Sequence, residues 1–214
     1  MSPTDLAIRR CSGADVRPHL DAVAALRIAV FRDWPYLYDG DPAYEREYLD
    51  AYATSPGSVF VLAFDGDAVV GASTGLPLAD DTAEFRAPFD AAGLDATRVF
   101  YFGESVLLPA YRGRGIGHAF FDHREAHARA LGRFGLTAFC AVDRSADDPR
   151  RPQGHRGNEA FWTKRGYVRR PGMTVRLRQT RPVPIVRIAE TDLALDASVA
   201  AEIFVATKIH SSFP

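Results

Sequence analysis

An apolar run, a glycine-rich turn and an amphipathic helix follow one another in the middle of the chain, and this order most constrains the fold. Apolar residues fill most of positions 99–108, which indicates a strand buried on both faces. The turn Arg112-Gly-Arg-Gly-Ile-Gly117 comes next and opens a helix predicted over 115–131, with Ile116 and Phe120 on its apolar face. This order predicts an α/β architecture.

The glycine turn suits a ligand that carries phosphate. Glycines let the backbone approach a bulky group closely. The first N–H groups of the following helix have no partner within it and lie at the positive end of the helix dipole, which favours an anion. Other phosphate-binding loops fit poorly, because no Gly-Lys-Ser/Thr follows and the spacing of a dinucleotide fingerprint is missing. A glycine turn without a ligand is the alternative.

In this context the turn resembles the signature of the GCN5-related N-acetyltransferase (GNAT) family, Gln/Arg-x-x-Gly-x-Gly/Ala. The segments Leu107-Leu-Pro-Ala-Tyr111 and Asn158-Glu-Ala-Phe-Trp162-Thr-Lys-Arg-Gly166-Tyr167 continue the resemblance, which covers residues 6–178. It implies an α/β (α+β) GNAT fold, a mixed and mostly antiparallel sheet of six to seven strands flanked by helices. It also implies acetyl transfer from acetyl-CoA to an amine.

Hydrophobic periodicity and turn residues predict the remaining elements. Strands are expected over 6–11, 58–64, 68–76, 135–142 and 173–178, and helices over 15–31, 43–52 and 158–165, with a short helix in the acidic segment 77–97. Beyond these, a strand over 183–190 and an alanine-rich helix over 192–207 are predicted. Residues 1–180 are interpreted as one GNAT domain, and 181–214 as a C-terminal extension or as its last strand and helix.

The resemblance also implies which residues bind the cofactor. Ser105, Val106 and Leu107 are expected to offer backbone groups to the pantetheine arm and the thioester. The residues expected around the pyrophosphate are Arg112, Gly113, Arg114, Gly115, Ile116, Gly117 and His118. Asn158 either caps the helix that follows it or contacts CoA.

Glu104 lies within an otherwise apolar strand, where an unpaired carboxylate is unfavourable. An alkylamine has a pKa of about 10.4, so only about one molecule in a thousand is neutral near pH 7.4, and a general base is needed. Glu104 is the predicted base, and a structural carboxylate paired with an arginine is the alternative. In this family a tyrosine protonates the leaving thiolate, but Trp162 stands at that position. Tyr111, Tyr167 or His155 are candidates to replace it, and unaided departure is a further alternative.

Segment 32–42 combines aromatic and acidic side chains. These are Trp34, Tyr36 and Tyr38 with Asp33, Asp39 and Asp41. The resemblance places this loop beside the acceptor site, where such side chains suit a cationic small-molecule amine. A folded surface loop with buried rings is the alternative.

Composition excludes several other classes. The net charge of −1 argues against nucleic-acid binding, and no apolar run is long enough to span a membrane. The first residues lack an apolar signal core, so a cytoplasmic protein is expected. Cys11 and Cys140 have no metal or redox spacing, and Cys140 is predicted to be a small buried side chain. His123 and His127 are interpreted as core histidines, so no metal site is expected.

Two alternatives to a small-molecule N-acetyltransferase stay open. A non-catalytic module that binds acyl-CoA is favoured by Trp162 in place of the tyrosine. A protein or peptide N-acetyltransferase would need an open acceptor groove. A homodimer is also left open.

Overall fold

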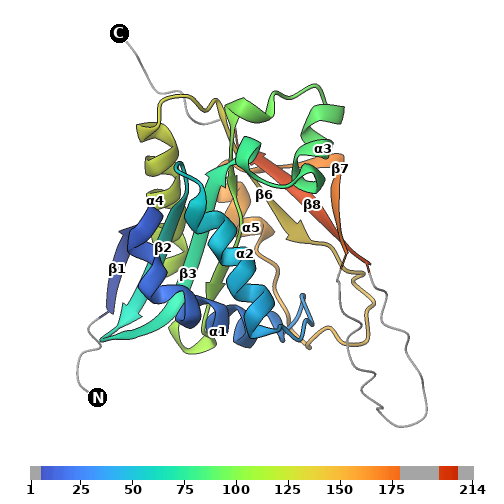
Figure 1. Ribbon diagram of the computed structural model, residues 1–214. Helices are drawn as coiled ribbons and strands as arrows, with labels where there is room; N and C mark the ends of the chain where they lie inside the picture. Colours follow the sequence, from blue (N-terminus) through green and yellow to red (C-terminus); the bar gives the residue numbers. More distant parts are fainter. Residues whose placement is uncertain (1–5, 179–197, 207–214) are drawn as a thin grey trace.

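Helices cover both faces of one mixed sheet in the computed structural model, which describes residues 6–178 and 198–206 (Figure 1). The strand order is β1-β2-β3-β4-β6-β8-β7, and β5 pairs with β3 beside this path. Within the described residues, β4 and β6 are the parallel neighbours and the other pairs are antiparallel. The bounds are β1 Leu6–Cys11, β2 Val59–Asp65, β3 Ala68–Pro77, β4 Val99–Phe102, β5 Ser105–Leu107, β6 Leu136–Val142, β7 Val168–Arg178 and β8 Ser198–Ala206. The predicted mixed and mostly antiparallel sheet flanked by helices is confirmed, and it has eight strands where six to seven were predicted.

Alternate residues of β2 belong to two different core clusters, and this shows which helices cover each face of the sheet. Phe60, Leu62 and Phe64 pack with α1 (Leu20–Phe31) and α2 (Pro42–Thr54) in one core cluster. Val59, Val61 and Ala63 belong to a second cluster with α4 (Ile116–Ala130). Because successive strand residues point to opposite faces, α1 and α2 lie on one side of the sheet and α4 on the other (Figure 1). The short helix α5 (Glu159–Lys164) packs with α4, and α3 (Ala83–Ala91) forms the helix predicted within segment 77–97.

The strand predicted over 99–108 is interrupted, so the prediction of one continuous strand is wrong. β4 ends at Phe102 and β5 begins at Ser105, with Gly103 and Glu104 between them. A Cβ atom on Gly103 would lie 2.6 Å from the Tyr52 hydroxyl and 2.6 Å from Oγ1 of Thr74. Glycine therefore lets α2 and β3 approach the chain where it leaves the sheet. Along β3 the partner changes from β5 to β4 across this break.

The helix predicted over 192–207 is also wrong, because residues 198–206 form β8 between β6 and β7. Alanine favours a helix, but two strand partners satisfy both edges of this segment and outweigh that preference. The Phe204 ring stacks on Phe139 with the centroids 5.3 Å apart. The predicted strand over 183–190 lies outside the described residues.

Smaller differences have local causes. The segment predicted as the start of the first helix is a 3-10 helix, Gly13–His19, and contains Pro18. Strand β7 begins at Val168, five residues before the predicted start at 173. His127 is half-buried with its Nε2 atom 3.0 Å from the carbonyl oxygen of Gly57, and burial lowers its pKa. His127 therefore has the hydrogen-bond partner expected of a core histidine, but it lies at the margin of the core because it is only half-buried.

Candidate active site

A cavity of about 780 Å³ lies where β5 separates from the sheet. Segments far apart in the sequence line it: the turn after α1, the β4–β5 break, the start of α4, the end of β6, the loop 143–157 and α5. Among the residues that the sequence singled out, the lining includes Trp34, Tyr36, Glu104, Ser105, Leu107, Arg112, Gly117, His155, Asn158 and Trp162. Val106, the glycines Gly113 and Gly115, Arg114, Ile116, His118 and Tyr38 are not among its described lining residues.

The edge of β5 that faces the cavity has free backbone groups. The Leu108 N–H donates to the Val70 oxygen, and the Thr74 N–H donates to the Glu104 oxygen. In an antiparallel pair, backbone groups of alternate residues point to the same neighbour. Val106 therefore directs its backbone to β3, while Ser105 and Leu107 direct theirs away from it. Among the described strands β6 pairs with β4 and β8 but not with β5, so this edge stays open.

The glycine turn has the geometry of an anion-binding helix start. Gly113 and Gly115 have φ angles of +77° and +80°, and a Cβ atom at either would meet nothing within 4 Å. Gly115 occupies the N-cap position of α4, and no side chain caps the helix. The first N–H groups of α4 are consequently available to a ligand. Arg112 and Gly117 line the cavity at this end.

Glu104 is buried and its two oxygens differ. Nη1 of Arg27 lies 2.5 Å from Oε2, and the Tyr48 hydroxyl donates to the same oxygen over 3.4 Å. Oε1 has no partner among the described atoms. Arg27 also pairs with Glu45 at 2.5 Å. Burial alone would lower the pKa of Arg27, but the two carboxylates and Tyr48 outweigh it and raise that pKa. Glu104 is therefore paired with an arginine, as the structural alternative predicts, and is also among the residues that line the cavity.

A tyrosine pair leads from Glu104 to a second buried acid. The Tyr48 hydroxyl is 3.0 Å from that of Tyr52, and Tyr52 hydrogen-bonds the Asp81 carboxyl. Burial is the main cause that raises the pKa of Asp81 to about 6, and the Thr82 N–H partly offsets it. Asp81 is thus an acid that titrates above the usual range of carboxyl groups.

Arg124 of α4 is 1% exposed and reaches the β4–β5 break from the other face of the sheet. Its Nη1 donates to the carbonyl oxygens of Thr74 and Glu104, at 3.2 and 3.1 Å, and its Nη2 donates to the Ser105 hydroxyl at 2.9 Å. The guanidinium lies over the Phe102 and Phe121 rings. Burial lowers the pKa of Arg124 to about 10, so the side chain remains a cation at neutral pH.

At the acceptor end, Trp34 and Tyr36 line the cavity, whereas Tyr38 hydrogen-bonds Glu45 outside it. The nearby acids have other partners. Asp39 pairs with Arg32, and Asp41 caps α2 by accepting from the Tyr44 N–H. The carboxylates of Asp39 and Asp41 therefore stabilise the loop and the start of α2.

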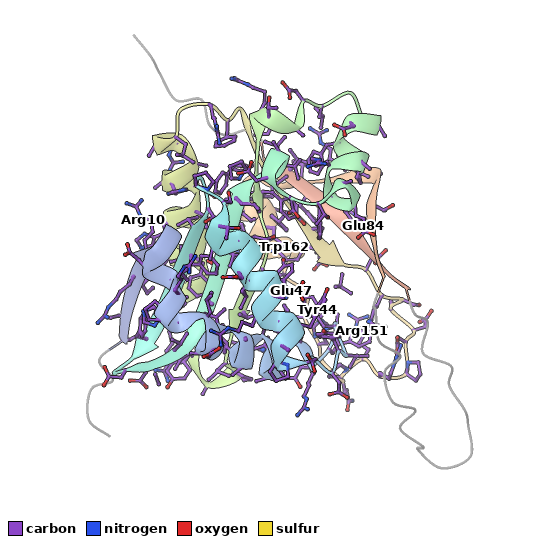
Figure 2. The ribbon with its side chains drawn as sticks, in the orientation of Figure 1. Arg10, Tyr44, Glu47, Glu84, Arg151 and Trp162 are labelled. Atoms are coloured by element: carbon purple, nitrogen blue, oxygen red, sulfur yellow. The ribbon has the colours of Figure 1, made fainter. Side chains whose placement is uncertain are left out.

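Arg144 ties the two loops at this end together. It donates to the carbonyl oxygens of Pro35 and Tyr36, the second at 3.0 Å, and its guanidinium lies 5.9 Å from the Trp34 ring. The His155 ring meets the edge of Trp34 with the centroids 6.1 Å apart. In Figure 2, Trp162 of α5 lies near the middle of the molecule and Arg151 of the loop 143–157 lies toward its lower right. Arg144 therefore links the loop 143–157 to the turn after α1 beside the cavity that both segments line.

The candidates for a proton donor do not all reach the cavity. The Tyr111 hydroxyl donates to Asp65 at 2.6 Å, and the buried Tyr167 hydroxyl contacts Glu125 and Thr137. Neither tyrosine is a described lining residue, whereas His155 is. Cys140, predicted as a buried hydrophobe, is half-buried and also lines the cavity, and burial raises its pKa to about 11.

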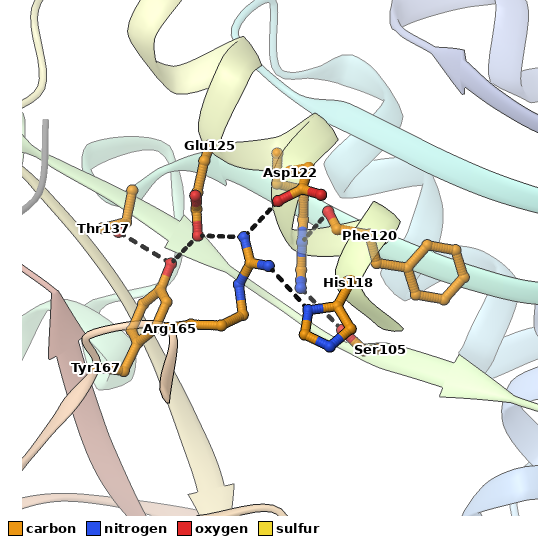
Figure 3. Close-up of polar contacts among 9 residues, drawn as sticks. Ser105, His118, Phe120, Asp122, Glu125, Thr137, Arg165 and Tyr167 are labelled. Atoms are coloured by element: carbon orange, nitrogen blue, oxygen red, sulfur yellow. Dashed lines mark hydrogen bonds and ion pairs between the residues drawn. The ribbon is translucent and has the colours of Figure 1, made fainter. Parts of the chain in front are cut away.

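Polar contacts hold α5 against α4 (Figure 3). Arg165 donates to Asp122 at 2.6 Å and to Glu125 at 3.2 Å, and its Nη1 lies 3.3 Å from Nδ1 of His118. Asn158 is the N-cap residue of α5, but its side chain makes no capping hydrogen bond. This leaves the Asn158 amide free to face the cavity that it lines.

Several site residues were missed from the sequence, namely Arg27, Tyr48, Tyr52, Asp81, Arg124 and Arg144. One signal was available for two of them. Arg27 follows Val23 and Ala24, and Arg124 follows Phe120 by one helical turn, so both are charges on apolar helix faces. Such a residue is buried with partners. Nothing local in the sequence distinguishes the other four.

The fold and the cavity define a class of protein, a mixed α/β fold with a phosphate-suited turn beside a split central strand. The model of the acetyltransferase (GNAT) family matches residues 24–152, so the chain belongs to this family, which uses acetyl-CoA for acetyl transfer. No curated protein matches the chain significantly.

Solved structures show the same fold at low sequence identity. An N-acetyltransferase of Staphylococcus aureus has a TM-score of 0.58 at 11% identity, covering 95% of this chain and 99% of its own. A ribosomal-protein-alanine N-acetyltransferase of Brucella melitensis gives 0.57 at 13%, covering 94% and 99%. The protein yncA of Salmonella typhimurium, a proposed acetyltransferase solved with its cofactor acetyl-CoA, gives 0.55 at 12%, covering 97% and 96%.

No described helix combines the length and apolar character needed to cross a membrane. In the same part of the chain, no group of three His, Cys, Asp or Glu side chains is arranged to hold a metal ion.

Proposed function

We propose that this protein transfers the acetyl group of acetyl-CoA to the primary amine of a small molecule, with Glu104 as general base. One observation carries the proposal. The described cavity lining brings together the start of α4, which suits an anion, the open edge of β5 and the buried residue Glu104. This arrangement supports a phosphate-bearing cofactor and a site of proton removal within a single cavity.

The residues present fit acetyl-CoA, which supplies an acetyl thioester when bound. Backbone N–H groups of Gly113 to His118, with Arg112, would hold the pyrophosphate. Ser105 and Leu107 would offer backbone groups to the pantetheine arm and to the thioester carbonyl. One such N–H donor contributes about 3 kcal/mol when charge develops on the carbonyl oxygen. Asn158, whose amide is free of a capping role, would contact the pantetheine arm.

Glu104 is suited to remove the amine proton. Arg27 and Tyr48 orient the carboxylate through Oε2, which leaves Oε1 to accept a proton. Deprotonating an alkylamine at pH 7.4 requires about 4 kcal/mol, which a positioned base supplies. The proton passes from the amine to Oε1 as the nitrogen attacks.

The link between the two loops at the acceptor site supports a small acceptor over a peptide. Arg144 bonds the loop 143–157 to Pro35 and Tyr36, which joins the two loops where they line the cavity. Trp34 and Tyr36 would contact the acceptor there. A non-catalytic module that binds acyl-CoA is the second candidate, favoured by Trp162 in place of a hydroxyl donor.

The test measures thiol release from acetyl-CoA with polyamines, aminoglycosides, amino acids and peptides. With an accepted amine, Glu104→Gln should lower kcat by about 10²–10⁴-fold. Glu45→Gln is the matched control, because Glu45 pairs with the same Arg27 but does not line the cavity. It should lower stability and change kcat only severalfold.

Three outcomes contradict parts of the proposal. An unchanged kcat in Glu104→Gln removes Glu104 as the base. Turnover by no amine, together with stabilisation by CoA, favours the binding module. A ligand at 100 times its Kd raises the free energy of unfolding by about 2.7 kcal/mol, so the absence of any thermal shift at millimolar CoA would reject the cofactor itself.

A further inference from the structure

We propose that Arg124 stabilises the leaving thiolate of CoA through its positive charge, in place of a proton donor. This inference rests on the proposed acetyl transfer. When the bond between the acyl carbon and sulfur breaks, its electron pair stays on sulfur. Arg124 keeps its own proton and donates a hydrogen bond to the sulfur, while the amine proton goes to Glu104.

The first support is the unusual charge environment of Arg124. Buried arginines normally pair with carboxylates, since an isolated buried charge is unfavourable. Among the described residues, this guanidinium hydrogen-bonds to three carbonyl oxygens and one hydroxyl, all neutral. The two rings beside it attract a cation but do not neutralise it. Glu104 and Glu125 act on Arg124 without a hydrogen bond to it, so an anion that reaches the cavity would be the first counter-charge bonded directly to the guanidinium.

The second support is a free donor at the right place. A guanidinium has five N–H groups. Nε donates to the carbonyl oxygen of Phe120, and Nη1 donates to those of Thr74 and Glu104. Nη2 donates to the hydroxyl of Ser105, which is labelled in Figure 3. Among the described residues, Nη2 donates one hydrogen bond, so its second N–H is left for a ligand. Arg124 lines the cavity beside Ser105, on the open edge where the thioester is proposed to lie.

The third support is the lack of a tyrosine donor. Trp162 stands where the family resemblance predicts tyrosine, and an indole N–H does not give up its proton near neutral pH. The hydroxyls of Tyr111 and Tyr167 are engaged elsewhere. A thiol has a pKa of about 8.5, and a nearby arginine lowers such values. A cation can consequently make the thiolate a better leaving group without proton transfer.

Other charged groups around Arg124 are already paired. Glu104 is held by Arg27, and Glu125 on the same helix is held by Arg165. Tyr167 faces Arg124 from the loop before β7, and burial raises the pKa of its hydroxyl, so it stays neutral. From β6, Cys140 also stays neutral near pH 7 because burial raises its pKa to about 11.

His155 lines the cavity from the loop 143–157, and Arg144 and Arg112 are further cations there. The test must therefore separate Arg124 from these groups. CoA and desulfo-CoA share all phosphates and differ only in the thiol, so the ratio of their Kd values isolates the thiol from every contact with phosphate.

The experiment measures both Kd values by calorimetry from about pH 6 to about pH 9.5. If the bound thiol has a pKa at least about 1 below its free value, the preference for CoA over desulfo-CoA rises about tenfold across this range, because the thiolate is bound more tightly. In Arg124→Gln the preference should not change with pH, and in Arg124→Lys the rise should persist. Arg124→Met, an apolar side chain suited to the space between two rings, replaces the Gln variant if that variant does not fold.

Arg86→Gln is the matched control, since Arg86 also donates to main-chain carbonyls, of Ala79 and Asp81, but outside the described cavity lining. It should behave as the parent does. The role of Arg124 is overturned if the parent's preference for CoA over desulfo-CoA does not change with pH. It is also overturned if a neutral variant at Arg124 keeps the rise of this preference with pH. Neither result bears on the proposed acetyl transfer. If neither CoA nor desulfo-CoA binds the parent, the proposed function falls as well.

Discussion

Asp81 gives a quantitative prediction, because its carboxyl titrates differently in the folded and unfolded states. Burial raises its pKa from 3.8 to about 6 in the folded protein. A carboxyl whose folded pKa is raised destabilises the fold when it ionises. The destabilisation is complete above about pH 6 and disappears below about pH 3.8. A pKa difference of about 2 corresponds to about 3 kcal/mol at pH 7.5, which is the upper limit for this effect.

The variant Asp81→Asn removes the ionisation and keeps an oxygen that can accept from the Thr82 N–H. We expect the variant to be more stable than the parent at pH 7.5 by up to about 3 kcal/mol, and the two to converge near pH 4. Urea denaturation followed by circular dichroism at several pH values measures this. The difference between variant and parent cancels the titration of all other groups.

Asp95→Asn is a control of opposite sign. Hydrogen bonds from the Thr97 side chain and backbone lower the pKa of the exposed Asp95 carboxyl. Its ionised form stabilises the fold, so Asp95→Asn should be less stable than the parent at neutral pH and converge with it in acid. A stability difference for Asp81→Asn that does not change between pH 4 and pH 7.5 would refute the reasoning about its burial.

Two further variants test the shape of the site. Gly103→Ala places a methyl group 2.6 Å from the Tyr52 hydroxyl, so the free energy of unfolding should fall by about 1–3 kcal/mol and kcat should fall as well. Gly135→Ala, which meets nothing nearer than 4.0 Å, should leave both unchanged, and equal stabilities of the two variants would contradict the steric argument. Arg165→Gln frees α5 from Asp122 and Glu125 on α4, so KM for acetyl-CoA should rise severalfold with little change in kcat. An unchanged KM in steady-state kinetics would show that this anchoring does not shape the cofactor site.

The order of the elements could be predicted from the sequence because periodicity and turn residues are local signals. The break after Phe102 could not, since it depends on the contact of Tyr52 with Gly103 from a distant helix. Strand β8 was missed for a related reason. Its alanines favour a helix, and its strand partners β6 and β7 lie elsewhere in the sequence.

In the candidate site, too, some features carry a local sequence signal, whereas others depend on residues far away in the sequence. The glycine turn and Glu104 carry local signals, a motif and a charge in an apolar run. The partners of Glu104 come from α1 and α2, at sequence distances that no motif spans. The acidic loop residues were expected to face a cationic acceptor, but Asp39 and Asp41 have partners within their own loop and helix. The roles assigned to individual site residues stay predictions until they are tested.

Two buried arginines from opposite layers meet the same residue, Glu104, at the point where the central strand divides. Arg27 of α1 holds its carboxylate, and Arg124 of α4 holds its carbonyl oxygen. The charges are divided unequally, because Arg27 faces two carboxylates, Glu104 and Glu45, while Arg124 bonds none. The α1 side therefore carries local negative charge suited to removing a proton, and the α4 side carries local positive charge suited to receiving an anion.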